Sequence, residues 1–193
     1  MPNRDAASDD AAMREGGMKL RLAIVGAGYS GLRALESLHL ALGPSAQVTV
    51  VDGRTGGQHP PLASATDPRA QFGMPVFLRG DAGRIDPVKR EVLLEDGRFI
   101  GFDAVLMAIG APVPPGHGVV ARSGFGDEAG LIPTDRCMRH PAHPNLYAIG
   151  ACAAPPVEVT TLDDDERIAI AVRALTRDVG RGGQLPGPLR PPR

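Results

Sequence analysis

The chain has 193 residues, of which 42% are hydrophobic and 22% charged, and its formal net charge is −1 at pH 7. This length suits one domain with small additions and is sufficient to bury a hydrophobic core. The near-zero charge lacks the basic field that is typical of proteins that bind nucleic acid or anionic membranes. In addition, no apolar run of the sequence approaches the roughly 20 residues of a membrane-spanning helix.

The N-terminal segment and the cysteines indicate the cellular compartment. Residues 1–17 are small and charged without apolar periodicity, which predicts a disordered segment. They carry no apolar stretch of the kind found in secretory signals. The two cysteines, Cys137 and Cys152, provide no disulfide framework and indicate a reducing compartment. We therefore expect a cytoplasmic protein with no transmembrane segment and no nucleic-acid partner.

Residues 22–31, Leu-Ala-Ile-Val-Gly-Ala-Gly-Tyr-Ser-Gly, place three glycines at the spacing of a dinucleotide-binding turn. Gly26 allows the chain to turn sharply out of a strand, and Gly28 leaves room for a pyrophosphate to approach the backbone. Gly31 allows the following helix to pack close to the strand. The unpaired N–H groups at the start of that helix would then face the phosphates, in the favourable direction of the helix dipole.

The segments on both sides have the form that this motif requires. Leu20–Val25 is a strand-like apolar run, and leucines at helical spacing follow it up to Gly43-Pro44, which should end the helix. Gln47–Val51 is a second predicted strand. It leads to Asp52, 21 positions after Gly31, where a carboxylate would bind an adenosine ribose hydroxyl. Glycine-rich turns also join strands to helices in proteins without a ligand, so this block alone does not separate the two interpretations.

The middle of the chain changes in character. Residues 53–75 are rich in Gly, Pro and Ala and predict a loop. Val76–Ile100 has an antiparallel pattern, with a hairpin turn predicted at Asp96-Gly97. Ala104–Ala108 is another buried strand, and the Pro- and Gly-rich residues 111–118 that come after Gly110 predict a linker.

The last third contains one predicted strand and one predicted helix. Leu146–Ile149 forms the strand, and the helix should begin near Thr161, which has capping-box spacing with Asp164. An apolar stripe continues to Gly180, which can end the helix. Residues 181–193 are rich in Pro and Gly and predict a flexible tail.

Three blocks, in this order, resemble the pyridine nucleotide-disulfide oxidoreductase superfamily, the flavoproteins with two dinucleotide-binding domains. Within it, the type II NADH dehydrogenases and sulfide:quinone oxidoreductases are most similar. The first block is Ile24–Leu32 with Asp52. The second runs over residues 80–110, and the third over 130–152, with Ala-Ile-Gly-Ala at 148–151 where the family has Ala-Ile-Gly-Asp. The resemblance implies an α/β fold, a Rossmann-like FAD/NAD(P)-binding domain over residues 18–180, with a parallel sheet and an antiparallel β-meander.

The resemblance also implies FAD as the cofactor and assigns residues to it by position. The glycine-rich turn would line the pyrophosphate, Asp52 would bind the adenosine ribose, and the last helix would direct its N-terminus at the flavin. The implied cofactor-binding residues are Gly26, Gly28, Tyr29, Ser30, Gly31, Asp52, Gly53, Arg54, Ala82, Ala108, Gly110, Gly150 and Ala151. No residue stands out as a catalytic acid or base.

The sequence departs from the family at three points. Only residues 111–118 stand where the family inserts an NAD(P)H-binding domain of some ~50 residues or more, and no second G-x-G-x-x-G follows. Ala151 replaces an aspartate that accepts hydrogen bonds from the cofactor. Ile109 replaces a threonine but remains a β-branched strand residue.

These observations leave more than one function open. The first interpretation is a minimal FAD-dependent oxidoreductase that a partner protein or a small-molecule donor reduces. The alternative is a catalytically degenerate nucleotide-binding or interaction module, a truncated member of the family, and a third is an NAD-binding domain. Cys137, His140 and His143 lie in a proline-containing loop without an evident fourth ligand, so we expect no metal site. An apolar surface left where the second domain would pack could drive formation of a homodimer.

Overall fold

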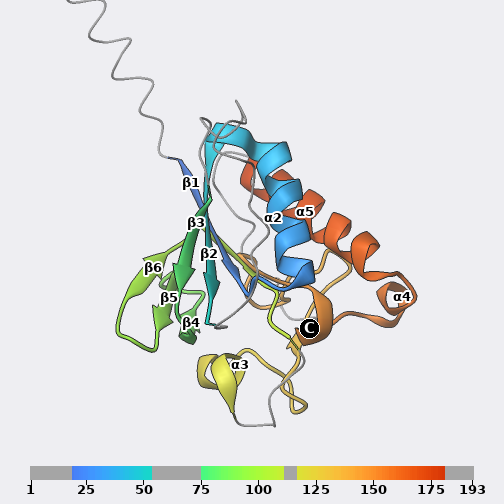
Figure 1. The fold of residues 1–193 in the computed structure, drawn as a ribbon. Helices are drawn as coiled ribbons and strands as arrows, with labels where there is room; N and C mark the ends of the chain where they lie inside the picture. Colours follow the sequence, from blue (N-terminus) through green and yellow to red (C-terminus); the bar gives the residue numbers. More distant parts are fainter. Residues whose placement is uncertain (1–18, 54–74, 111–116, 181–193) are drawn as a thin grey trace, which may run out of the picture.

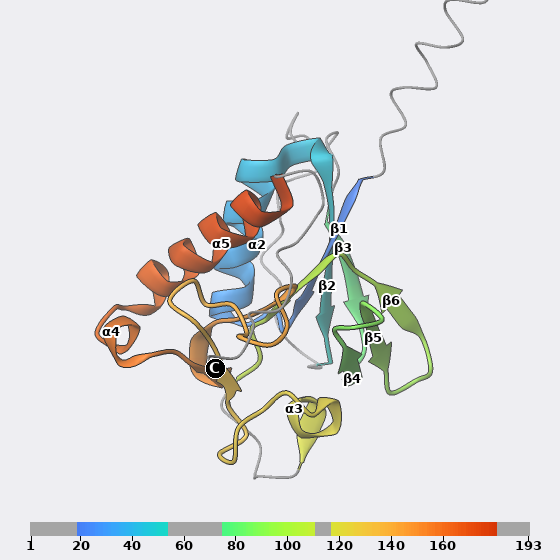
Figure 2. The same cartoon turned by 180° about the vertical axis from the view of Figure 1, so that it is seen from behind.

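The computed structural model describes residues 19–53, 75–110 and 117–180. The N-terminal segment 1–17 and the tail 181–193 lie outside the described residues, as does most of the predicted loop 53–75. The described residues form three layers, with two long helices on one face of a five-stranded sheet and a three-stranded sheet on the other (Figures 1 and 2).

The central sheet is parallel throughout. Its strand order is β3 (Val76–Arg79), β2 (Ala46–Asp52), β1 (Leu20–Val25), β7 (Ala104–Met107) and β9 (Leu146–Ala148). The inner strands are apolar on both faces because both faces are covered, as in parallel sheets generally. The α/β class predicted from the sequence is therefore confirmed.

Helices α2 (Tyr29–Leu42) and α5 (Asp164–Gly180) lie side by side on one face of the sheet (Figures 1 and 2). Leu35 and Leu38 of α2 and Leu175 of α5 are almost completely buried in the core cluster between this layer and the strands. Helix α2 ends before Gly43, as the Gly-Pro pair predicts.

The opposite face carries the antiparallel meander of β4 (Ala82–Asp86), β5 (Glu91–Leu94) and β6 (Phe99–Gly101). The hairpin turn predicted at Asp96-Gly97 is confirmed, and Gly97 has the positive φ of 88° that such a turn requires. A short helix, α3 (Gly118–Ser123), packs on β4. The remaining elements are η1 (Gly43–Ser45), β8 (Ile132–Pro133), η3 (Gly150–Cys152), β10 (Ala153–Ala154) and α4 (Val157–Thr160).

Two sequence-based expectations about these elements were wrong. Val76–Arg79 is not part of the antiparallel meander, because it pairs in parallel with β2, Val76 lying in register with Thr49. The direction of a strand is set by the strand with which it pairs, and the hydrophobicity pattern of four residues does not reveal it. The linker expected over residues 111–118 ends earlier than predicted, since Gly118 already begins α3.

The start of α5 also differs from the prediction. The helix begins at Asp164 and not near Thr161, and the capping box is formed by a different pair. The Asp163 carboxylate accepts a hydrogen bond from the Glu166 N–H at 2.8 Å, and the Glu166 carboxylate accepts one from the Asp163 N–H at 3.0 Å. Glu at the third helical position completes the reciprocal pair better than Asp at the position that the Thr161 spacing selects.

The packing of α2 against β1 depends on two glycines. Gly26 has φ +105°, and its N–H donates to the Val51 carbonyl at 2.8 Å, which fixes the turn at the end of β1. A Cβ added to Gly31 would overlap the Gly26 carbonyl oxygen. By contrast, a Cβ added to Gly28, whose φ is −74°, would meet no heavy atom of the described residues within 4 Å. The start of α2 therefore contacts the Gly26 backbone closely at Gly31, whereas the space beside Gly28 is free of other described atoms.

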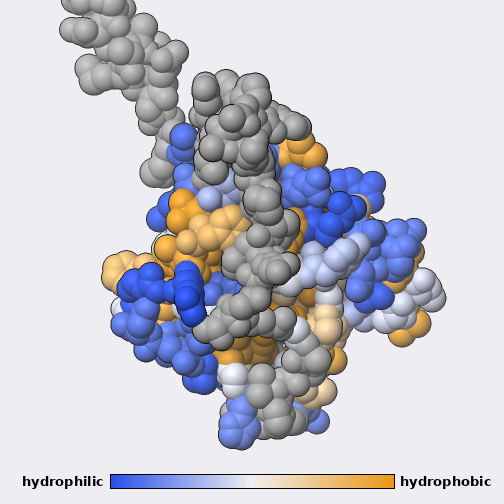
Figure 3. Space-filling view, in the orientation of Figure 1, coloured by the Kyte–Doolittle hydropathy of each residue, from blue (hydrophilic) through white to orange (hydrophobic). Residues whose placement is uncertain are grey.

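An apolar patch lies over β3 and β6 on the face shown in Figure 3. Val76, Phe77 and Phe99 contribute to it with exposed fractions of 43%, 37% and 70%. This patch is on the edge strand of the parallel sheet and on the neighbouring meander.

The loop before β9 is held by a buried histidine. The Nδ1 atom of His140 accepts hydrogen bonds from the N–H groups of Ala142 and His143 at 3.1 and 3.2 Å, and its Nε2 atom lies 3.1 Å from the Phe125 carbonyl oxygen. This pattern requires the neutral ring with its proton on Nε2. Burial, and then the nearby His143, lower the pKa of His140.

We predict that the Gly31→Ala substitution destabilises the fold by about 1–3 kcal/mol, because the added methyl group meets backbone that cannot move without shifting β1 or α2. The matched control, Gly28→Ala, places the same methyl group in open space and should change the free energy of unfolding by less than about 1 kcal/mol. Urea denaturation followed by circular dichroism measures both values. Equal destabilisation by the two substitutions would contradict the packing described here.

We also predict that the free energy of unfolding falls as the pH decreases from about 7.5 to about 5.5. The unfolded histidine takes up a proton near its ordinary pKa of 6.5, whereas the folded one resists protonation because its pKa is lowered. The unfolded state therefore binds more protons in this range, and acidification favours it. Urea denaturation at the two pH values should give a smaller difference for His140→Asn, whose amide oxygen keeps an acceptor without a titration. A wild-type protein that gains stability on acidification in this range would refute the assignment.

Candidate cofactor-binding cleft

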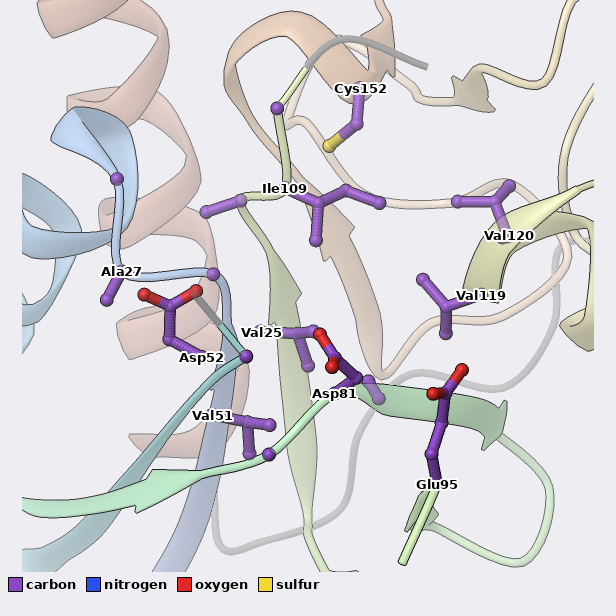
Figure 4. Close-up of a pocket in the computed structure, with 18 of the residues that line it drawn as sticks. Val25, Ala27, Val51, Asp52, Asp81, Glu95, Ile109, Val119, Val120 and Cys152 are labelled. Atoms are coloured by element: carbon purple, nitrogen blue, oxygen red, sulfur yellow. The ribbon is translucent and has the colours of Figure 1, made fainter. Parts of the chain in front are cut away.

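A cleft of about 350 Å³ opens at the carboxyl ends of β1, β2 and β7 (Figure 4). This size lies in the usual range of small-molecule sites, roughly 300–1,000 Å³. The carboxyl edge of a parallel sheet is where open α/β folds bind their ligands. The glycine-rich turn forms one wall, with Gly26, Ala27 and Gly28 lining the cleft.

The N-terminus of α2 faces this cleft without a cap. Gly28 is the N-cap residue and has no side chain to accept from the first helical N–H groups, and the first turn holds no acidic residue. The space beside Gly28 is open among the described residues. Unpaired N–H groups at a helix N-terminus favour a bound anion, and a phosphate is the natural ligand for such a position.

One side of the cleft carries carboxylates. Figure 4 shows Asp52, Asp81 and Glu95 along this side, each at or just beyond the end of a different strand. Glu95 pairs with Arg122 of α3 at 2.9 Å. Among the described residues, neither the Asp52 nor the Asp81 carboxylate accepts a hydrogen bond or pairs with a cation. These two groups are thus available to hydroxyl or amino donors of a ligand.

The other side of the cleft is apolar. Figure 4 shows Ile109, Val119, Val120 and Cys152 there. The Cys152 thiol donates to the Ile149 carbonyl at 3.3 Å, and burial raises its pKa to about 12. It is therefore a protonated wall residue at neutral pH and not a nucleophile. Cys137 and Cys152 are both free thiols.

The N-terminus of α5 contrasts with that of α2. Its first turn contains Asp164, Asp165 and Glu166, and in the Asp163–Glu166 capping box the N–H groups of Asp163 and Glu166 each donate to the other residue's carboxylate. Asp165 accepts a hydrogen bond from the Tyr29 hydroxyl at 2.8 Å and lies 3.7 Å from the Arg33 guanidinium. The two helix starts are thus linked, but only that of α2 presents an uncapped end.

The structure brings about half of the residues predicted from the sequence into this cleft. Those that line it are Gly26, Gly28, Asp52, Gly53, Ala82, Ala108 and Gly110. Gly31 does not line the cleft, but it lies directly behind Gly26, whose carbonyl oxygen a Cβ on Gly31 would overlap. The Tyr29 side chain points to α5, and Arg54 lies outside the described residues.

The second motif lies next to the first. A Cβ added to Gly150 would come within 2.8 Å of the Ser30 hydroxyl oxygen, which places the turn after β9 against the start of α2. The Ala151 side chain is exposed. Gly150, Ala151 and Ser30 are therefore adjacent to the uncapped helix end, although they are not among the residues that line the cleft.

Several lining residues were missed by the sequence analysis. Asp81 follows the end of β3 as Asp52 ends β2, so a parallel assignment of Val76–Arg79 would have identified it. Glu95, Val119 and Arg122 reach the cleft only through the packing of the meander and α3, which the local pattern does not reveal.

The described part of the chain shows no group of His, Cys, Asp or Glu residues able to hold a metal ion. Within the same residues, no helix is both long and apolar enough to cross a bilayer.

Comparison with known proteins identifies the family. A sequence model described as pyridine nucleotide-disulphide oxidoreductase matches residues 3–176. The chain is 33% identical over 162 residues to the 5,5′-dehydrodivanillate O-demethylase ferredoxin reductase subunit of Sphingobium sp., a match that covers 78% of this chain. The matched region spans 37% of the length of that relative.

Solved structures show the same fold at low sequence identity. The sulfide:quinone oxidoreductase of Aquifex aeolicus has a TM-score of 0.56 at 12% identity, over 84% of this chain and 77% of that one. The NADH:rubredoxin oxidoreductase of Clostridium acetobutylicum has a TM-score of 0.51 at 12% identity, over 91% and 78% of the two chains. With its glycine-lined cleft and Rossmann-like sheet, the chain belongs to the pyridine nucleotide-disulphide oxidoreductase family, a family of flavin-binding proteins.

Proposed function

We propose that the chain binds FAD by its ADP part in the cleft and functions as an FAD-dependent oxidoreductase domain served by an external electron donor. The observation that carries this proposal is the uncapped N-terminus of α2 beside the Asp52 carboxylate, which has no partner among the described residues. A pyrophosphate needs the first feature, and an adenosine ribose hydroxyl needs the second. When bound, the flavin supplies the hydride and electron transfer that the protein side chains cannot perform.

The chain's own residues would bind and orient the cofactor. Gly26 and Gly28, with the backbone of Tyr29 and Ser30, would hold the pyrophosphate. Asp52 would accept a hydrogen bond from the ribose, with Gly53, Arg54 and Ala82 near the adenosine. Ala108 and Gly110 would lie along the cofactor, and Gly150 with Ala151 would approach it from the turn after β9.

A second function is favoured by Ala151. In the family that the chain resembles, an aspartate at this position accepts hydrogen bonds from the cofactor. Loss of such a hydrogen bond costs roughly 1–3 kcal/mol of binding free energy, or about 5- to 150-fold in affinity. The closed N-terminus of α5 further reduces the positive field on that side, because carboxylates already occupy it. Both observations support a module that binds an adenine nucleotide without flavin catalysis.

The proposed electron-transfer partner is a small iron–sulfur carrier protein. The curated relative is named a ferredoxin reductase subunit. If this chain shares that role, a ferredoxin would exchange electrons with the bound flavin. The FAD-binding domain over residues 18–180, the cytoplasmic location and the homodimer expected from the sequence stay predictions.

We expect the purified protein to take up FAD and to show flavin absorption bands that dithionite bleaches. Ala151→Asp should tighten FAD binding by about 5- to 150-fold, because it adds an acceptor at an exposed position next to Ser30. Gly28→Ala should weaken binding by about tenfold or more, since its methyl group occupies the space beside the helix end. Quenching of flavin fluorescence in a titration measures all three affinities.

A protein that remains colourless and binds neither FAD nor ADP-ribose would contradict the proposed site. Binding of ADP-ribose without FAD would support the nucleotide-binding module and refute the oxidoreductase. Gly31→Ala is unsuitable as a binding control because it acts on the fold.

A further inference from the structure

Helix α3 forms a wall of the cleft that differs in kind from the other walls. Gly118, Val119, Val120 and Arg122 line the cleft from this helix, and Figure 4 shows Val119 and Val120 on its side of the cleft. The glycine-rich turn and the ends of β1, β2 and β7 are backbone walls, which the parallel sheet holds in place. Helix α3 is outside that sheet, so a movement of this helix would widen the cleft and leave the parallel strands as they are.

Polar side chains attach α3 to the meander. The Arg122 guanidinium donates to the Gly83 carbonyl at 2.6 Å and pairs with the Glu95 carboxylate at 2.9 Å. The Ser123 hydroxyl accepts a hydrogen bond from the Ile85 N–H at 2.8 Å. A few hydrogen bonds of this kind stabilise a docked element modestly, because water replaces them when it undocks. The attachment is therefore of the type that opens locally while the core stays folded.

The apolar contact of α3 is small and depends on a glycine. Val120 is the one buried residue of this helix, with 6% of its surface exposed. A Cβ added to Gly126 would come within 2.5 Å of the Val120 Cγ1 atom, so the valine fits here because Gly126 has no side chain. A helix of six residues is also too short to persist by itself once it leaves its partner. Undocking would thus expose the backbone amides of α3.

Glycines stand at both ends of α3. Gly118 has φ +78° and Gly124 has φ +75°, and glycine moves between positive and negative φ at little cost. Directly after Gly124 the chain is fixed, since Phe125 is buried and its carbonyl oxygen lies 3.1 Å from the His140 Nε2 atom. Residues at the ends of short elements serve as hinges in this way. A movement of α3 can therefore end at Phe125 without reaching β8.

From these observations we infer that α3 is a lid, which undocks from the meander to admit and release the ligand of the cleft. With α3 docked, the cleft has about 350 Å³, near the lower end of the roughly 300–1,000 Å³ of small-molecule sites. A dinucleotide is a large ligand, and its entry requires a wall that moves. The opening of α3 is independent of the proposed function, whereas the choice of FAD as the ligand rests on it.

The first measurement is amide hydrogen exchange over residues 118–124 in the protein without ligand. Ser123→Ala removes the acceptor of the Ile85 N–H, and Ser123 is not among the residues that line the cleft. Exchange over 118–124 should become about fivefold faster, because the loss of one hydrogen bond favours the undocked helix. Gly126→Ala should raise it by a similar factor or more, since its methyl group displaces Val120.

Ser37→Ala is the matched control. It removes the hydrogen bond that the Ser37 hydroxyl donates to the Arg33 carbonyl at 3.0 Å on α2, away from the lid. Exchange over residues 118–124 should stay within about twofold of the wild type in this variant. Thermal unfolding of each variant shows whether it is folded.

The second measurement distinguishes a lid from a wall that only shapes the site. If α3 opens before FAD enters and before it leaves, Ser123→Ala raises the association and dissociation rates by the same factor, about fivefold, and leaves Kd within about twofold of the wild type. A variant that only weakens contacts with the ligand instead raises mainly the dissociation rate, and Kd rises with it. Stopped-flow flavin fluorescence measures both rates.

The outcomes separate the lid from the function of the cleft. Wild-type exchange over residues 118–124 in both Ser123→Ala and Gly126→Ala refutes the lid, whether or not FAD binds, and so does equally fast exchange in Ser37→Ala. Faster exchange together with a rise in the dissociation rate alone refutes its role in ligand entry. If the wild-type protein binds neither FAD nor ADP-ribose, the proposed function fails, and the exchange measurement still decides whether α3 opens.

Discussion

The contact between Gly31 and the Gly26 carbonyl is the constraint on which the cofactor-binding cleft depends, because it fixes where α2 begins relative to β1. It sets the first turn of α2 directly against the end of β1, with no side chain between them. The positive φ of Gly26 turns the chain so that the uncapped end of α2 faces the carboxyl edge of the sheet. The glycine-rich wall of the cleft therefore depends on this one backbone contact.

The two long helices show that N-terminal capping distinguishes a helix start that can bind a ligand from one that only stabilises the fold. Both run along the same face of the sheet and both begin near its carboxyl edge (Figures 1 and 2). At the start of helix α5, the N–H groups of Asp163 and Glu166 donate to side-chain carboxylates, and the helix holds α2 through the Tyr29–Asp165 hydrogen bond. Among the described residues, no side chain caps the first N–H groups of helix α2. An unpaired helix end costs stability unless water or a ligand satisfies it, which is why this end is the one suited to a ligand.

The part of the fold that could be predicted from the sequence is the part with strong local signals. Leu20–Val25 is observed as a strand with the predicted bounds, because its run of buried residues has no competing interpretation. The hairpin at Asp96-Gly97 and the end of α2 at Gly43 follow from the conformational demands of glycine. Asp52 lines the cleft at the distance along the chain that the motif fixes, and its role in binding a ribose stays a prediction.

What could not be predicted depends on tertiary partners. The direction of β3 is decided by β2, and with it the position of Asp81. Glu95 and Arg122 meet only because α3 packs on the meander. At α5 the local signal was ambiguous, since Thr161–Asp164 and Asp163–Glu166 both have capping spacing, and the structure uses the pair that contains Glu. The carboxylates of the cleft are thus a property of the assembled fold more than of any motif.

The central claim is that the N–H groups at the start of α2 bind the phosphates of an adenine-bearing cofactor. Amide hydrogen exchange, measured by mass spectrometry with and without saturating FAD, tests it most directly. We expect slower exchange at residues 28–31 on addition of FAD and no change at Asp163 and Glu166, whose N–H groups already donate to carboxylates. Unchanged exchange at residues 28–31, or protection confined to the start of α5, would contradict it.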